Sequence, residues 1–180
     1  MILHQQRQVT AIWLLSLATL AFGGSLPTAI AAQSDATVVY LVRHAERAED
    51  GTSDPPISRA GQQRAELIAT LLRDAGITHI HTTDLKRTRS TGAPTSESTG
   101  LAMAIYDAQD LEGFADRLRE TPGRHLVLGH SNTTPQLAEA LGGDPSTPIE
   151  EMEYDRLYVL TLTSTGTSTV LLRFGNPYGD

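Results

Sequence analysis

The stretch that decides the fold is residues 37–46, TVVYLVRHAE, in which an apolar run ends at an arginine and a histidine. Residues 37–42 are all apolar or β-branched. A continuous run of this kind is expected for a strand buried on both faces, as in a parallel sheet. The Arg43-His44 pair therefore stands at the carboxyl end of a predicted central strand.

The rest of the chain alternates short strand-like runs with helical patterns, which is typical of βαβ units. Ser58 is placed to cap the first helix, and Gly76 follows its end. We expect further strands at residues 77–82, 102–106 and 125–128, and helices at residues 58–75, 86–97, 110–120 and 133–141.

Two strands, at residues 156–163 and 168–174, are predicted to form a closing antiparallel hairpin around residues 164–167. The sequence thus predicts an α/β fold, a three-layer α/β/α sandwich around a mainly parallel central sheet with a C-terminal antiparallel hairpin. We find no internal repeat and no interdomain linker, so one domain is expected.

Composition narrows the possible chemistry. The chain has 180 residues, of which 39% are hydrophobic, and it has no cysteine. That excludes a disulfide scaffold, a thiolate zinc site and a cysteine nucleophile. The formal net charge is -7, so an extended nucleic-acid surface has little support. Any phosphate chemistry must depend on a local basic pocket.

The first 32 residues have the pattern of a secretory signal peptide. Arg7 is their one Lys, Arg, Asp or Glu, and residues 9–22 form an apolar run that small residues follow. We expect a cut after Ala31 or Ala32, leaving a domain at residues 33–180 that is periplasmic or secreted and meets a membrane only during export. The alternative is an uncleaved anchor, for which the run is short.

Basic side chains recur where predicted strands end. Arg43 and His44 follow the first strand, Arg87 comes shortly after residues 77–82, and His130 follows Gly129. Ligands of open α/β sheets bind beyond the carboxyl ends of the strands. Guanidiniums match phosphate oxygens, and an imidazole is a competent nucleophile near neutral pH. The pattern predicts a phosphoryl-transfer site.

At these residues the chain resembles the histidine phosphatase superfamily, also called the phosphoglycerate mutase-like family. The motifs occur in family order and are Arg43-His44-Ala45-Glu46, Ser58-Arg59-Ala60-Gly61, Thr83-Asp84-Leu85-Lys86-Arg87 with Thr91 and Ala93, and Gly129-His130-Ser131-Asn132. The resemblance implies that His44 is the phosphorylated nucleophile and that Arg43 and Arg87 clamp the phosphate. It also implies that His130 is a second imidazole at the transferring group and that Asn132 contacts substrate.

This chemistry places demands on His44. The ring must present a neutral nitrogen to phosphorus, so its other nitrogen needs an acceptor such as a backbone carbonyl. The two arginines and His130 can stabilise the equatorial oxygens, as a metal does in other enzymes. We therefore expect neither a metal nor another cofactor.

The acid that protonates the leaving oxygen is left open by the sequence. Mutase-like members carry a glutamate within a Gly-rich, aromatic segment, where this chain has residues 107–114 with Asp110 and Glu112. Phytase-like members have an Asp where this chain has Ser131, and mutases tend to have an Asn where it has Asp50. The phytase branch and mutase activity are therefore disfavoured, and the donor is Asp110, Glu112 or neither.

Two further groups have simpler interpretations. His79 and His81 share one face of a strand, but no third histidine or carboxylate has matching spacing, so they are predicted to be structural. An acidic run is predicted to be a solvated loop that could also screen the pocket from highly charged substrates, and it comprises Glu150, Glu151, Glu153 and Asp155.

The leading hypothesis is an exported phosphomonoester hydrolase that acts on a small phosphorylated substrate through a phosphohistidine on His44. An exported sugar phosphatase suits the signal peptide. A phosphohistidine-protein phosphatase is an alternative, although such substrates are usually cytoplasmic. The rival class is a non-catalytic protein of the same fold that binds phosphoryl ligands.

Overall fold

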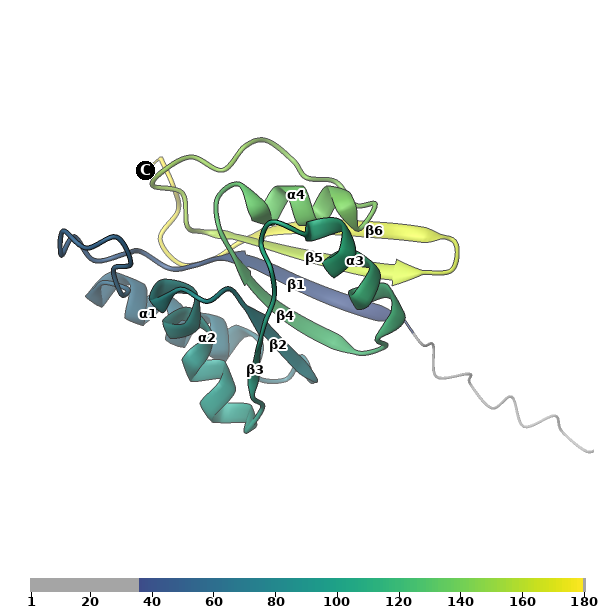
Figure 1. Ribbon diagram of the computed structural model, residues 1–180, viewed down its shortest axis with the longest axis horizontal. Helices are drawn as coiled ribbons and strands as arrows, with labels where there is room; N and C mark the ends of the chain where they lie inside the picture. Colours follow the sequence, from purple (N-terminus) through teal and green to yellow (C-terminus); the bar gives the residue numbers. More distant parts are fainter. Residues whose placement is uncertain (1–35, 180) are drawn as a thin grey trace, which may run out of the picture. The chain divides into compact units, whose positions relative to one another are not determined.

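The computed structural model describes residues 36–179, so the predicted signal peptide lies outside the described residues. Its centre is a six-stranded sheet in the order β3-β2-β4-β1-β5-β6 (Figure 1). The strands are β1 (Thr37–Arg43), β2 (His79–Thr82), β3 (Met103–Ile105), β4 (Arg124–Gly129), β5 (Arg156–Thr163) and β6 (Gly166–Arg173). The first four run parallel, whereas β5 is antiparallel to β1 and β6 is antiparallel to β5. The predicted mainly parallel sheet and C-terminal hairpin are confirmed.

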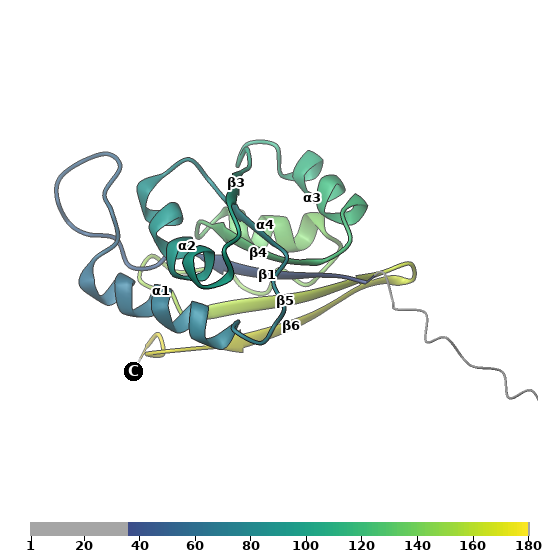
Figure 2. The same ribbon diagram turned by 90° about the horizontal axis from the view of Figure 1, so that it is seen from below.

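Four helices cover the two faces of this sheet (Figures 1 and 2). They are α1 (Arg59–Leu71), α2 (Lys86–Thr99), α3 (Leu111–Glu120) and α4 (Thr133–Ala140). The first two pack together on one face, and α3 and α4 pack together on the other. This is the expected three-layer arrangement. No helix within residues 36–179 is long and apolar enough to cross a membrane.

The alternation of side chains along β1 explains its continuous apolar run. Val39 and Leu41 point to the core on the α3 and α4 face, while Tyr40 and Val42 pack on the α1 and α2 face. Because both faces are covered, every position of β1 benefits from burial. The strand can therefore hold Arg43 and His44 at a fixed place.

Some element boundaries differ from the predicted ones. Helix α1 ends at Leu71 rather than at residue 75, and its backbone closes in turns before Gly76. Helix α2 continues past Pro94 to Thr99. It ends there because Gly100, at φ 72°, adopts the left-handed conformation that terminates a helix. Strand β6 begins at Gly166, which leaves a two-residue hairpin loop where four residues were expected.

Candidate active site

Three neighbouring strands bring the predicted site residues together at one edge of the sheet, on the left in Figure 1. Arg43 is the last residue of β1, and His44 N donates to Gly129 O at the end of β4, at 2.8 Å. The rings of His44 and His130 lie 5.4 Å apart between centroids. Arg87 comes from the first turn of α2, after β2.

His44 is held in the tautomer that a nucleophile needs. Its Nδ1 donates to its neighbour's carbonyl oxygen, Ala45 O, at 2.8 Å, which leaves Nε2 with a free lone pair. The same neighbour is anchored, since Ala45 N donates to Thr91 Oγ1 at 2.9 Å. Burial, together with the nearby Arg43, His130 and Arg87, lowers the pKa of His44 to about 3, although the bond to Ala45 O opposes this shift. The ring is neutral at pH 7.

His130 is oriented by a pair of threonines. Its Nε2 lies 3.1 Å from Thr83 Oγ1, which lies 2.8 Å from Thr88 Oγ1. Because the Thr88 hydroxyl donates to backbone carbonyls, Thr83 donates to Thr88 and accepts from His130. Burial, followed by the charges of Arg87 and Arg43, lowers the pKa of His130 to about 4. The second imidazole is therefore also neutral at pH 7.

Arg43 is the more deeply buried of the two guanidiniums, with 4% of the residue exposed. Its Nη1 donates to Glu150 O at 2.8 Å and to Glu153 O at 2.9 Å. Its Cζ lies 4.1 Å from the centre of the Tyr154 ring, a cation–π contact. Burial lowers the pKa of Arg43, while Tyr154 and nearby glutamates oppose that shift.

Arg87 is held by a carboxylate that sequence reasoning did not single out. Its Nη1 lies 3.7 Å from Asp54 Oδ1. The same carboxylate accepts from Lys86 N at 3.1 Å, at the start of α2. Asp54 therefore joins the loop after β1 to the helix that carries Arg87. Its one sequence signal is an acidic residue ahead of two prolines.

The two arginines share a property that suits an oxyanion. The Nε atoms of Arg43 and Arg87 are buried, and neither has a hydrogen-bond partner within the described residues. Buried donors are normally paired, and guanidinium donors pair best with phosphate or carboxylate oxygens. The part of the chain that the structure describes holds no group of three or more His, Asp or Glu side chains able to bind a metal. The site is therefore suited to a phosphoryl group flanked by two cations and two neutral imidazoles.

The Ser58–Gly61 motif shapes the chain next to His44, the predicted nucleophile. Ser58 Oγ accepts from Gly61 N at 3.1 Å and caps α1. A Cβ at Gly61 would overlap the carbonyl oxygen of Glu46, two residues after His44. Glycine is needed here for the close approach of α1 to the loop that follows β1.

Three other predicted residues form no side-chain hydrogen bond or ion pair with the four central ones within residues 36–179. Asp110 caps α3, where its carboxylate accepts from Gly113 N at 3.0 Å, and Glu112 lies in the first turn of that helix. Both line a hollow with Gln136. Asn132 is exposed at the start of α4, two residues after His130. The roles predicted for these residues stay predictions.

The acidic run was wrongly predicted to be wholly solvated. Glu150 is exposed as expected, but Glu153 and Asp155 are each 2% exposed. Both accept hydrogen bonds from Arg173 Nη1, at 2.6 Å and 2.7 Å. Closely spaced carboxylates suggest a solvated loop when the sequence is considered alone. Here Arg156 of β5 and Arg173 of β6 neutralise them, and only the folded sheet brings these arginines close.

The histidines of β2 have a third partner that their spacing did not reveal. His81 Nε2 lies 3.0 Å from His125 Nδ1, and the His79 and His125 rings stack at 4.6 Å between centroids. The partner was missed because His125 is opposite His79 across two parallel strands that are far apart in the sequence. Nothing in these contacts gives the group a role beyond the structural one.

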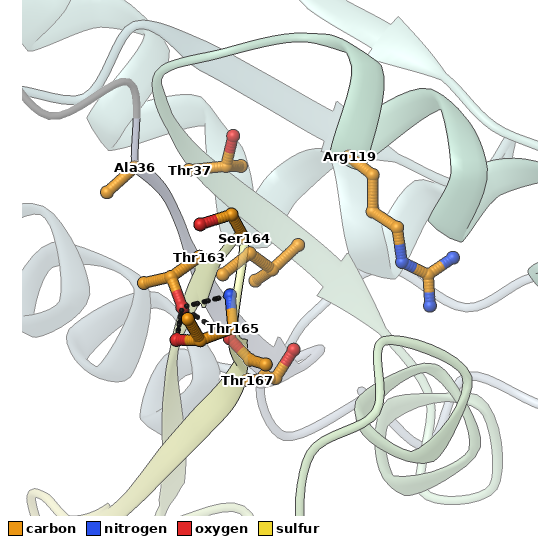
Figure 3. Close-up of a pocket in the computed structure, with 9 residues that line it drawn as sticks. Ala36, Thr37, Arg119, Thr163, Ser164, Thr165 and Thr167 are labelled. Atoms are coloured by element: carbon orange, nitrogen blue, oxygen red, sulfur yellow. Dashed lines mark hydrogen bonds between the residues drawn. The ribbon is translucent and has the colours of Figure 1, made fainter.

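A hollow of about 870 Å³ lies at the opposite end of the sheet from the candidate site, around the β5–β6 turn (Figure 3). It is larger than the hollow of about 580 Å³ beside Asp110 and Glu112. Threonine and serine hydroxyls line the larger hollow together with Arg119, whose Nη1 pairs with Asp116 at 2.7 Å. Cavity size therefore does not identify the candidate active site.

The fold and the site define a protein with two imidazoles and two guanidiniums arranged for phosphoryl chemistry at a parallel-sheet edge. The model of the histidine phosphatase superfamily (branch 1) matches residues 39–113. The chain belongs to the histidine phosphatase superfamily, as the resemblance in its motifs predicted.

Curated relatives include probable phosphoglycerate mutases GpmB. One, from Escherichia coli O1:K1 / APEC, is 42% identical over 108 residues, and one from Escherichia fergusonii is 44% identical over 108 residues. Each match covers 51% of this chain and 50% of the relative. The chain thus spans about half the length of the curated relatives it matches.

Solved structures support the fold. The protein histidine phosphatase SixA complexed with tungstate has a TM-score of 0.60 at 19% identity, over 75% of this chain and 94% of that one. A putative α-ribazole-5′-P phosphatase from Escherichia coli has a TM-score of 0.65 at 16% identity, over 77% and 96%. A putative phosphohistidine phosphatase SixA from Agrobacterium tumefaciens has a TM-score of 0.59 at 25% identity, over 78% and 98%.

Proposed function

We propose that this protein is an exported phosphomonoester hydrolase that works through a phosphohistidine on His44. The observation that carries the proposal is the position of a neutral His44, with Nε2 free, beside two arginines whose buried Nε donors have no hydrogen-bond partner among residues 36–179. Export rests on the signal-peptide pattern of residues 1–32. The product would be released in the periplasm or outside the cell.

The geometry supports a two-step reaction. Arg43 and Arg87 bind the non-bridging oxygens, and His44 Nε2 attacks phosphorus in line with the ester oxygen. The P–O bond breaks, its electron pair stays on the leaving oxygen, and that oxygen takes up a proton from solvent. Water then attacks phosphorus and gives up a proton to solvent, the P–N bond breaks, and inorganic phosphate leaves as His44 regains its lone pair. Arg43 and Arg87 donate to the equatorial oxygens in both steps. His130 adds a third donor only when its Nδ1 is protonated, because its Nε2 proton is donated to Thr83.

The leaving group limits the choice of substrate. Asp110 accepts from Gly113 N and pairs with Arg117. Among residues 36–179, neither Asp110 nor Glu112 bonds to the four central residues, so neither is assigned as the acid. A substrate whose leaving group hardly needs a proton would then react fastest; aryl and acyl phosphates, with an oxygen leaving atom, and phosphohistidine, with a nitrogen one, are of this kind. A small phosphorylated molecule fits the site, and no feature of the described surface calls for nucleic acid.

Two alternatives have support of their own. Structural neighbours include protein histidine phosphatases named SixA, which favours a phosphohistidine-protein phosphatase. The other neighbours include phosphatases of a ribazole phosphate and of glucosyl-3-phosphoglycerate, which favours a small sugar-like substrate. The non-enzymatic alternative is a protein that keeps the two arginines, binds phosphoryl ligands and does not hydrolyse them.

Covalent labelling separates these classes. The protein is mixed with a ³²P-labelled aryl phosphate and quenched within milliseconds in alkaline detergent, because a phosphohistidine bond survives alkali and is cleaved by acid. We expect an acid-labile label on the wild type and none on the His44→Ala variant. Reversible phosphate binding with neither label nor released phosphate would instead establish the binder.

A further inference from the structure

The segment at residues 150–155, EEMEYD, holds the guanidinium of Arg43. Two of its backbone carbonyls, Glu150 O and Glu153 O, accept from Arg43 Nη1 at 2.8 Å and 2.9 Å. The ring of Tyr154 lies against the same guanidinium, at 4.1 Å. All three contacts come from one short stretch before β5. The position of Arg43 therefore depends on the shape of that stretch.

Glu153 fixes this shape from inside. Its carboxylate Oε2 accepts from Glu150 N at 3.0 Å, and its own backbone N donates to Glu150 O at 3.0 Å. These two bonds close the turn whose carbonyls face Arg43. With 2% of the residue exposed, the carboxylate is shielded from water.

Glu153 is also the centre of a buried ion network. Arg156 donates to both carboxylate oxygens, from Nε at 2.6 Å and from Nη2 at 2.9 Å. Arg173 Nη1 donates to Glu153 at 2.6 Å and to Asp155 at 2.7 Å. Two guanidiniums thus balance two carboxylates, which burial of charge requires. Burial by itself raises the pKa of Glu153, but the bonds from Arg156, Glu150 and Arg173 lower it to about 2.

The network extends to the chain just before the turn. Arg156 Nη1 donates to Thr147 O at 2.6 Å, and its Nη2 donates to Pro148 O at 3.1 Å. The same guanidinium therefore secures Glu153 and the two residues that lead into the segment. One rigid unit then links β5 to the carbonyls that hold Arg43.

We propose that Glu153 is a positioning residue for Arg43, acting through the turn at residues 150–153. The inference rests on the proposed function, since it takes Arg43 to be a phosphate clamp. Holding Nη1 on two carbonyls leaves Nε and Nη2 of Arg43 for phosphoryl oxygens. Small displacements of a positioning group can cost about 10²-fold in rate. Glu153 thereby affects catalysis without touching substrate.

Asp155 provides the matched control. It is as buried as Glu153 and shares Arg173 with it, but its other side-chain acceptor bond is to Tyr178 N, at 3.2 Å, and not to the turn. The Glu153→Gln and Asp155→Asn variants therefore remove one buried charge each from the same network. Only the first change loosens the carbonyls that hold Arg43.

The experiment measures kcat/KM for an aryl phosphate and the dissociation constant of vanadate, in wild type and in both variants. We expect Glu153→Gln to lower kcat/KM about 10- to 100-fold and to raise the dissociation constant of vanadate by a similar factor. Asp155→Asn should change both by less than about threefold. In an Arg43→Ala background, Glu153→Gln should add less than about twofold, because its effect passes through Arg43.

Equal losses in the two variants, or a full loss that multiplies with Arg43→Ala, would overturn the proposal and leave Glu153 a structural residue. If Glu153→Gln does not fold, the Glu153→Gln/Arg156→Gln pair, which leaves no unpaired charge in the network, is used in the same comparison. If the wild type hydrolyses nothing, the proposed function fails. Vanadate affinity measured by calorimetry still tests the link between Glu153 and Arg43.

Discussion

The protein contains two groups of histidines that differ in place and in neighbours. His44 and His130 lie at the carboxyl ends of β1 and β4, whereas His79, His81 and His125 lie on β2 and on the first half of β4. Burial lowers the pKa of His44 to about 3, and lowers that of His130 and of His81 to about 4. A low pKa is therefore common to both groups.

The neighbours separate the two groups. Two arginines lie beside His44 and His130, and their buried Nε donors have no partner in the part of the chain that the structure describes. The β2 group instead packs on Phe114, with ring centroids 5.2 Å apart at His81, and His125 Nε2 donates to Thr121 O at 2.9 Å. Burial alone shifts a pKa, but catalysis also needs charge aimed at the reacting group. This comparison identifies the chemical site better than the pKa values do.

The largest effect is expected from His44, the proposed nucleophile. His44→Ala should remove phosphatase activity, by a factor on the order of 10⁶, while the fold stays intact. His81→Gln is the control from the other group and should retain activity within about threefold. Steady-state hydrolysis of an aryl phosphate, with circular dichroism of each variant, checks this. Wild-type turnover in His44→Ala would end the assignment.

The arginines come next. Arg43→Ala and Arg87→Ala should each weaken transition-state binding, measured from the fall in kcat/KM, by about 2 to 4 kcal/mol. Each change removes a preorganised charged donor. Arg117→Ala is the control, because Arg117 lies 5.6 Å from the Phe114 ring beside the β2 histidines. Its kcat/KM should be unchanged. An arginine whose loss leaves catalytic efficiency near that of wild type does not belong to the site.

Acid stability should report the β2 group. The folded-state pKa of His81, about 4, is below the ordinary value of 6.5. The unfolded chain therefore binds more protons between these two values, and the stability contributed by neutral His81 is complete above pH 6.5 and lost as pH falls toward 4. Urea unfolding at several pH values measures the free energy of unfolding. Between pH 6.5 and pH 4 this free energy should fall by about 1 to 3 kcal/mol less in His81→Gln than in wild type. An identical pH dependence would contradict this.

The smallest effect concerns the two acids of α3. Asp110→Asn and Glu112→Gln should leave the ratio of alkyl to aryl phosphate hydrolysis unchanged within about twofold, because neither carboxylate contacts the histidines and arginines of the site. Asn also caps helices well, so the first variant should fold normally. Efficient alkyl phosphate cleavage that is lost in one variant would identify that residue as the acid, since general acid catalysis contributes about 10²- to 10⁴-fold.

Much of the site could be predicted because its residues follow buried strands. A continuous apolar run marks β1, so Arg43 and His44 could be placed at its carboxyl end, and the same logic placed His130 after β4. The backbone carbonyl expected to hold the other nitrogen of His44 is Ala45 O. Each of these features depends on residues close together in the sequence, so a short sequence pattern is enough to predict it.

Partners that are distant in sequence could not be predicted. Asp54 lies 32 residues from Lys86, and Glu153 depends on Arg156 and on Arg173 from the next strand. His125 joins His81 across 44 residues. An acidic run and a pair of histidines have the same composition whether solvated or buried, so their environment is set by the strands beside them.

The sequence by itself determined the order of strands and helices and the strand ends that carry Arg43, His44 and His130. Tertiary structure decided which carboxylates are buried, which histidines meet, and how each arginine is held. The physical reason is that hydrophobic periodicity and capping act over a few residues, whereas burial of charge depends on countercharges that only the folded sheet brings together.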